Sequence, residues 1–373
     1  MKMRNFSFAV LLLSVLASGS ICRAVSIGVI DRVRSKGVLS NADLRVIDDF
    51  VEDAVEGLFL SRDFTSISKL RTIILQRKNS SMQSAQAQYS EQFSESSYKY
   101  LSDLLARSDG LEPAIRKTST IINLLILIDG LEDIRLVELA LGKVKNSNEL
   151  VRYWAVHAVT NESIVQELND GGLESVEQAS KILRELKGVI TSSDSETLRL
   201  ITKFASASKI GGTGLLMQVT DVRINRYAGW SVENGLLDAM ILKQLHSEMS
   251  STGYSDAQAA RRFGQLYSYV MQKYIMDVSG GDFLTDKERN DLASVLVEVE
   301  KYCVSEILDM PQSVIKTYIE RGDSAGLSRE YLRLFGDQTH QGKLSVNLDI
   351  DYGDGGGNAK RAIPLKLPVK RQG

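Results

Sequence analysis

Proline is almost absent from most of this chain, and that absence constrains the fold more than any other feature. Only four prolines occur among 373 residues, at positions 113, 311, 364 and 368. A proline inside a helix removes a hydrogen bond and clashes with the preceding turn, whereas chains built from many turns use proline often. The long stretch from Val25 to Met310, which contains only Pro113, therefore favours long helices.

Hydrophobic residues recur at helical spacing through this stretch. Three long amphipathic segments lie at 233–249, 255–278 and 285–308. Apolar residues three or four positions apart share one face of a helix. We therefore expect an all-α protein. The spacing is clearest near residue 50, where the apolar residues are Leu44, Ile47, Val51, Ala54, Val55 and Leu58.

Several helix starts are marked by a hydroxyl residue followed three positions later by an acid or an amide. In this capping box the hydroxyl accepts a hydrogen bond from a free amide of the first turn, and the acid or amide bonds back. We expect helices to begin at four such pairs and at a weaker fifth. They are Ser175/Gln178, Ser193/Glu196, Ser255/Gln258, Thr285/Glu288 and, as the weaker relative, Ser40/Asp43.

The first 24 residues have the pattern of an export signal. Lys2 and Arg4 precede an apolar run at 6–17, which is too short to span a bilayer comfortably and is followed by small residues. Cleavage after Ala24 or after Gly19 fits the small-residue rule, and we favour Ala24. The pattern predicts an exported protein, periplasmic or extracellular.

Cys22 raises an alternative, since bacterial lipoproteins begin at a cysteine that follows a signal. A lipidated cysteine needs a small residue just before it, and here Ile21 occupies that position. We therefore favour a cleaved signal over a lipid anchor at Cys22.

The remaining chain is mildly acidic. The formal net charge is −2, and loss of residues 1–24 would remove three further positive charges. Such a chain has no global basic field, so we expect no nucleic-acid partner. No later segment has the length of a transmembrane helix. Cys303 would be the only cysteine, so the mature protein would depend on its hydrophobic core and not on disulfides.

Three segments share one helical pattern: an apolar residue followed by arginine, a small or semi-small residue at +4 and a buried-type residue at +7. Positions +4 and +7 lie on the same helix face as the first residue, so small side chains there let a second helix approach closely. The segments are 112–125 with Ile115, Ser119 and Ile122, 148–161 with Val151, Ala155 and Ala158, and 195–208 with Leu198, Thr202 and Ala205.

The sequences "EPAIR" (112–116) and "NELVR" (148–152) resemble the second helices of HEAT-type α-solenoid repeats. The resemblance covers about 98–208 and implies stacked helix pairs, in which Arg152 reaches a neighbouring repeat. It predicts N-terminal helices at 25–97, HEAT-like repeats at 98–210 and a C-terminal helical region at 211–341, continuing as a bundle. Trp154 would then pack at the edge of the core.

No arrangement of reactive residues predicts a catalytic, cofactor or metal site. The histidines at 157, 246 and 340 lack zinc-site spacing, and Cys303 falls on an apolar helical stripe. The glycines of "KIGGTGLLMQ" (209–218) lack the lysine of a phosphate loop, so we expect a turn between helices. The segment "DIDYGDGGGN" (349–358) resembles a calcium-binding loop only weakly. Such loops place Gly at position 6 and Glu at position 12, and here those positions are Asp354 and Lys360, so we expect no calcium site.

The period changes in the final segment, residues 342–373, which we expect to form an extended or β-hairpin basic tail. Two runs alternate apolar and polar residues around a glycine-rich stretch, and Pro364 and Pro368 restrict the second run to a strand edge or an extended segment. The apolar side could dock on the helical body or add to a protein partner. These candidate partner-binding residues are Leu344, Val346, Leu348, Ile350, Ile363, Leu365, Leu367 and Val369.

Taken together, these patterns predict a non-enzymatic scaffold or adaptor that binds a protein partner in the cell envelope and uses no cofactor. The alternative is an envelope hydrolase or ligand-binding enzyme whose site is assembled from scattered residues. An enzyme should contain a deep pocket with converging polar groups, whereas a scaffold should present a broad, shallow surface. A fold of this class does not fix the function.

Overall fold

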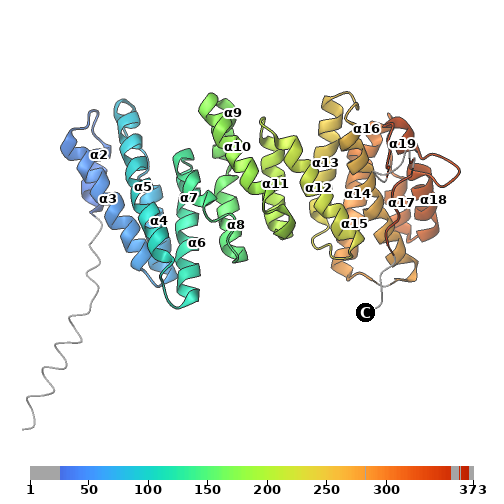
Figure 1. Ribbon diagram of the computed structural model, residues 1–373, viewed down its shortest axis with the longest axis horizontal. Coiled ribbons are helices and arrows are strands. Elements are labelled where there is room, and N and C mark those ends of the chain that lie inside the picture. The colour runs from blue at the N-terminus through green and yellow to red at the C-terminus, as the bar shows by residue number, and fades with distance from the viewer. Residues whose placement is uncertain (1–25, 282, 354–360, 362, 369–373) are drawn as a thin grey trace, which may run out of the picture. The chain divides into compact units, whose positions relative to one another are not determined.

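The computed structural model describes residues 26–281, 283–353, 361 and 363–368 (Figure 1). The predicted signal peptide, Cys22 and Val369 lie outside the described residues. The chain divides into two compact units, here called unit 1, up to Ala140, and unit 2, from Leu141. This boundary falls inside the segment predicted to hold the repeats, 98–210. The described residues are mainly helical and contain no β-strand, so the prediction of an all-α protein is confirmed.

Unit 1 is built around α3, which packs most extensively against α5. The third and fourth turns of α3 bury Phe50, Val51 and Ala54, and Phe93 of α5 lies against Phe50. Helix α4 covers both α3 and α6. The helices of unit 1 are α2 (Ile27–Arg34), α3 (Asn41–Leu60), α4 (Phe64–Leu75), α5 (Gln86–Ser108) and α6 (Ala114–Leu131), and α7 (Val137–Leu141) crosses the boundary.

Unit 2 begins as two layers of stacked helices. Helix α11 packs against α8 and α13, while α12 packs against α10 and α14, and α11 and α12 join the layers. Helix α9 lies in the longest interval between the three similar segments. The helices are α8 (Glu149–Val159), α9 (Glu162–Asp170), α10 (Leu173–Lys187), α11 (Ser195–Ala207), α12 (Gly212–Ala228), α13 (Leu236–Ser251), α14 (Ala257–Met276), α15 (Asp286–Val299), α16 (Ser305–Ile307), α17 (Val314–Arg321), α18 (Ser324–Phe335) and α19 (Lys343–Asn347).

Two of the five predicted capping boxes form at the predicted residues. Thr285 and Glu288 exchange both hydrogen bonds at the start of α15. The weaker pair, Ser40 and Asp43, does the same at the start of α3. The reciprocal bonds satisfy amides that the first helical turn would otherwise leave free.

The other three predicted starts are displaced or wrong. Helix α11 is capped by Asp194 and helix α14 by Asp256, one residue after the predicted serine in each case. Aspartate is as good an N-cap as serine, so the pattern alone did not decide between neighbouring residues. Ser175 lies inside α10, whose N-cap is Gly172, so the box predicted there does not form.

The Ser40/Asp43 cap gives a pH-dependent prediction. Hydrogen bonds from the Lys36 ammonium, then from the Ser40 amide and hydroxyl, lower the pKa of Asp43 to about 2. Because the folded-state pKa lies below the unfolded value of about 3.9, the stabilisation is present above pH 4 and is lost as the pH falls towards 2.

We expect Asp43→Asn to cost about 1 kcal/mol at pH 7, the usual value of a cap. The variant should lose less stability than the wild type between pH 5 and pH 2, measured by thermal unfolding. If the variant and the wild type lose the same stability over this pH range, ionised Asp43 does not stabilise the start of α3 as described.

Two of the three similar segments bury the predicted face. Val151, Ala155 and Ala158 of α8 are buried, and so are Leu198, Thr202 and Ala205 of α11. Arg152 is also buried, and its guanidinium donates to the carbonyl oxygens of Asn146 and Ser192, at 3.0 and 3.3 Å.

In the first segment the prediction of a buried face is wrong. Ile115 is 77% exposed and Ser119 is exposed, because α6 buries a different face, which carries Ile121, Leu124, Leu125 and Ile128. Helix α6 contains apolar residues on several sides, so the Ile115 stripe was not the only candidate face. The face predicted to be buried is therefore open in unit 1.

The predicted strand at 344–350 is also wrong. Residues 343–347 form the short helix α19, and Leu344 and Leu348 are buried while Val346 is 59% exposed. Apolar residues four positions apart share a face in a helical turn as well as in a strand. A strand would place Val346 on the same face as Leu344 and Leu348, whereas a helix places it on another face. Val346 is exposed, which fits the helix. Among the described residues the sole β feature is an isolated bridge between Gly336 and Gln341.

A buried ion pair joins α12 to α13 inside unit 2. Arg223 and Asp238 form two hydrogen bonds of 2.7 and 2.9 Å, and both side chains are fully buried. The Tyr227 hydroxyl donates to the same carboxylate at 2.7 Å. Arg223 also donates to the carbonyl oxygens of Glu233 and Asn234. The network fixes the α12–α13 connection against the start of α11.

Candidate functional site

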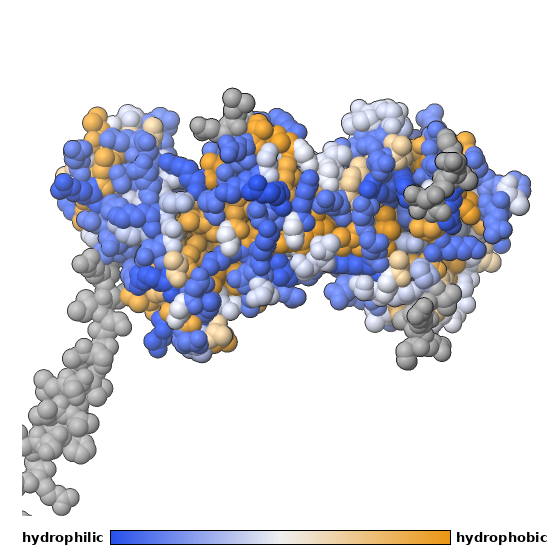
Figure 2. Space-filling view, in the orientation of Figure 1, coloured by the Kyte–Doolittle hydropathy of each residue, from blue (hydrophilic) through white to orange (hydrophobic). Residues whose placement is uncertain are grey.

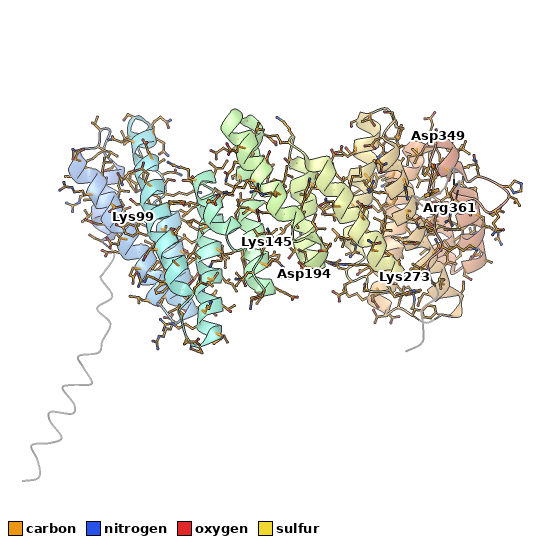
Figure 3. The ribbon with its side chains drawn as sticks, viewed as in Figure 1. Lys99, Lys145, Asp194, Lys273, Asp349 and Arg361 are labelled. Atoms are coloured by element: carbon orange, nitrogen blue, oxygen red, sulfur yellow. The ribbon has the colours of Figure 1, made fainter. Side chains whose placement is uncertain are left out.

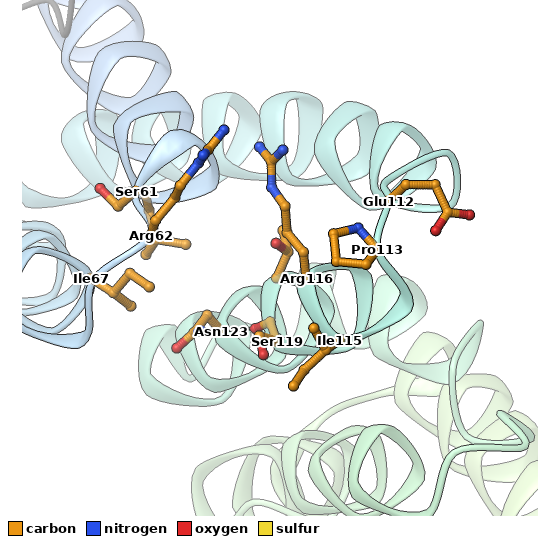
Figure 4. Close-up of a pocket in the computed structure, with 11 residues that line it drawn as sticks. Ser61, Arg62, Ile67, Glu112, Pro113, Ile115, Arg116, Ser119 and Asn123 are labelled. Atoms are coloured by element: carbon orange, nitrogen blue, oxygen red, sulfur yellow. Dashed lines mark hydrogen bonds between the residues drawn. The ribbon is translucent and has the colours of Figure 1, made fainter. Parts of the chain in front are cut away.

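The candidate site is a pocket of about 370 Å³ in unit 1, between the α3–α4 connection, α4 and the start of α6. Arg62 precedes α4, and Arg116 lies in the first turn of α6, which begins after Pro113. Ser61, Ser119 and Asn123 supply further polar groups to the walls. Figure 4 shows the side chains of Arg62 and Arg116 pointing to the same side of the pocket.

Neither arginine has an acidic partner among the described residues. No ion pair or side-chain hydrogen bond joins Arg62 or Arg116 to another described group. Glu112 is the one carboxylate of the lining, and it points away from both guanidinium groups (Figure 4). Asp63 is engaged in capping α4, where it accepts a hydrogen bond from the Ser66 amide. The pocket therefore holds two positive charges that the described residues do not neutralise.

The start of helix α6 increases this positive potential. The N-terminus of a helix carries a partial positive charge, which favours anions and disfavours cations. Helix α6 has no side-chain cap at Pro113, and Arg116 lies within its first turn. The N-terminus of α6 and the Arg116 guanidinium thus both favour an anion at this end of the pocket.

Apolar side chains flank the two arginines. Leu58, Ile67 and Ile115 line the same pocket, and Ile115 is among the most exposed large apolar residues described. On the face shown in Figure 2, hydrophobic residues reach the surface between hydrophilic ones. A ligand that fits this lining combines an anionic group with an apolar neighbour, as an acidic peptide segment does.

The lining combines charged, polar and apolar side chains, and it contains neither histidine nor cysteine. No group of three His, Cys, Asp or Glu side chains in the described part of the chain could hold a metal ion.

The residues that sequence reasoning considered for chemistry lie elsewhere. Cys303 is fully buried in unit 2, and burial raises the pKa of its thiol to about 12, so the thiol is a core residue as expected. His246 is buried near Tyr254 and Glu306, and burial lowers its pKa. Tyr153, Trp154 and His157 form a half-buried aromatic cluster on α8.

The predicted partner-binding tail packs on its own chain. Leu344, Leu348, Ile350 and Leu367 are buried in unit 2, whereas Val346 and Leu365 are 59% and 38% exposed. Ile363 is half-buried. Most of the predicted contact surface is therefore occupied within the chain, and the described residues 363–368 form neither a helix nor a strand.

A second groove of about 440 Å³, in unit 2, is lined by carboxylates at the starts of α8 and α11. Glu149 and Glu196 stand in first helical turns, and Asp194, labelled in Figure 3, caps α11. Acids at these positions stabilise the helix ends. Helix capping and the helix dipole already explain why these acids lie there. This groove is therefore a weaker candidate for a binding site than the pocket of unit 1.

No protein-family model matches the chain, and no curated protein is similar to it. Within the described residues, none of the helices combines the length and the apolar character that crossing a membrane requires.

Proposed function

We propose that the protein is an exported, non-enzymatic scaffold or adaptor of the cell envelope, which binds a partner protein through the pocket of unit 1. An acidic side chain of the partner would bind between Arg62 and Arg116, and an apolar neighbour would cover Ile115. The proposal rests on two guanidinium groups that have no acidic partner among the described residues and lie beside an exposed isoleucine.

Two further features support this proposal. The signal-like residues 1–24 favour export. The two-layer stacking of helices in unit 2, with the buried faces of α8 and α11, favours a HEAT-like scaffold, a class that presents surfaces to partners.

The double variant Arg62→Glu/Arg116→Glu tests the pocket. A hydrogen bond to a charged group contributes about 1.5–3 kcal/mol, so loss of both arginines should weaken partner binding roughly 100-fold or more. The measurement is a binding isotherm with the partner recovered from envelope extract. Folding should be unaffected, because neither side chain forms an ion pair with a described residue of unit 1.

The matched control is Arg32→Glu/Lys69→Glu, which makes the same charge change at two exposed residues of unit 1 outside the pocket. We expect the control to bind within about threefold of the wild type, since distant surface charges are screened by salt. Equal weakening by both double variants would show that net charge, and not the pocket, controls binding.

A further inference from the structure

Helix α14 holds residues 363–368 by means of two glutamines. Gln265 and Gln272 are seven positions apart, so they lie two turns apart on one face of the helix. The amide of Gln265 accepts a hydrogen bond from the Leu365 N–H at 2.8 Å and donates to the Leu365 carbonyl at 3.2 Å. Both backbone groups of one residue are thereby paired with one side chain.

Gln272 bonds to the backbone groups of two residues of the segment. It accepts from the Leu367 N–H at 2.7 Å and donates to the Leu365 carbonyl at 3.2 Å. In an extended chain the N–H and C=O groups of residues two apart point to the same edge. The two glutamines therefore bond to the edge that a neighbouring β-strand would bond to.

The indole of Trp230 extends this face towards the end of the segment. Its Nε1 donates to the Pro368 carbonyl oxygen at 2.8 Å, and Lys273 of α14 lies 5.9 Å from the centre of the ring. Figure 3 labels Lys273 and Arg361 in this part of unit 2. We call Gln265, Gln272 and Trp230 the α14 docking face.

The side chains of the segment differ in burial. Pro364 and Leu367 are buried, whereas Leu365 and Lys366 are exposed. The two buried positions are three residues apart. The segment held on the docking face thus carries a buried proline and, three residues later, a buried leucine, while the two side chains between them are exposed.

We propose that the α14 docking face is a receptor for extended peptides of this proline-x-x-leucine kind, and that residues 363–368 are its intramolecular ligand. A partner segment with the same pattern displaces them. Backbone hydrogen bonds supply affinity in this mode of recognition, and the two side-chain positions supply specificity. This site is separate from the pocket of unit 1 and does not depend on it.

The test uses the full chain and a fluorescent peptide with the sequence of residues 361–369, RAIPLKLPV. In the wild type the tethered segment competes at an effective concentration near millimolar, so the peptide binds weakly. Leu367→Asp places a charge at a buried position and weakens the tethered segment. We expect this variant to bind the peptide at least tenfold more tightly than the wild type. Adding Gln265→Ala and Gln272→Ala should abolish the gain.

Peptide displacement in the wild type provides a second measurement that no substitution can disturb. Excess RAIPLKLPV should speed hydrogen exchange at the Leu365 and Leu367 amides, while a scrambled peptide should leave it unchanged. The proposal is overturned if a folded Leu367→Asp chain binds no more tightly than the wild type. Unchanged exchange at these amides under excess peptide would also overturn it, whether or not the variant folds.

Discussion

Asp238→Ala should lower the free energy of unfolding of unit 2 by about 3–5 kcal/mol, the usual cost of removing one partner of a buried ion pair. The substitution leaves the Arg223 guanidinium charged and fully buried, without the carboxylate that accepts its two shortest hydrogen bonds. It also removes the acceptor of the Tyr227 hydroxyl. Chemical denaturation followed by circular dichroism measures the loss.

The comparison variant is Glu298→Ala, which removes an ion pair with Lys243 in the same unit. That pair has an N–O distance of 2.6 Å, but its side chains are 45% and 38% exposed. Exposed pairs contribute about 0–1 kcal/mol, so this variant should unfold close to the wild type. If the two variants lose similar free energies of unfolding, burial does not set how much each ion pair contributes to stability.

Tyr352→Ala should be the second most damaging substitution, with an expected loss of about 3–5 kcal/mol. Tyr352 is 1% exposed and packs against Gly264, where an added Cβ would lie 2.3 Å from the tyrosine oxygen. The substitution would leave a cavity between α14 and the segment that follows α19. Thermal and denaturant unfolding of the full chain measure the effect.

Tyr352→Phe is the matched control, because it keeps the buried ring and removes only the hydroxyl, which forms no close hydrogen bond with any described residue. We therefore expect a change below about 1 kcal/mol. A small loss for Tyr352→Ala would instead show that the segment around residue 352 contributes little to the core of unit 2.

The sequence predicted the helical class well because proline spacing and apolar periodicity act locally. The caps of α3 and α15 were also predictable, since each depends on two residues three positions apart. The tail was harder to predict, because Leu344 and Leu348 fit a helical turn and a strand equally well. Burial against α18 and neighbouring helices decided between them, and that burial is a tertiary effect.

The candidate site could be predicted only in part. Arg116 was recognised as a member of a repeat pattern, which assigned Ile115 to a buried face and so hid the pocket. Arg62 has no local signal at all, because its significance depends on the approach of the α3–α4 connection to α6. That neither arginine has an acidic partner among the described residues is likewise a result of folding, which the local sequence does not show.

Site-directed photo-crosslinking tests the central claim most directly. A photo-reactive phenylalanine replaces either Ser119, in the pocket, or Glu91, exposed on α5 outside it. The proposed function predicts one crosslinked partner from position 119 and none from position 91, with the crosslink in an acidic segment and lost in Arg62→Glu/Arg116→Glu. Equal crosslinking at both positions, or a crosslink at 119 that survives the charge reversal, would contradict it.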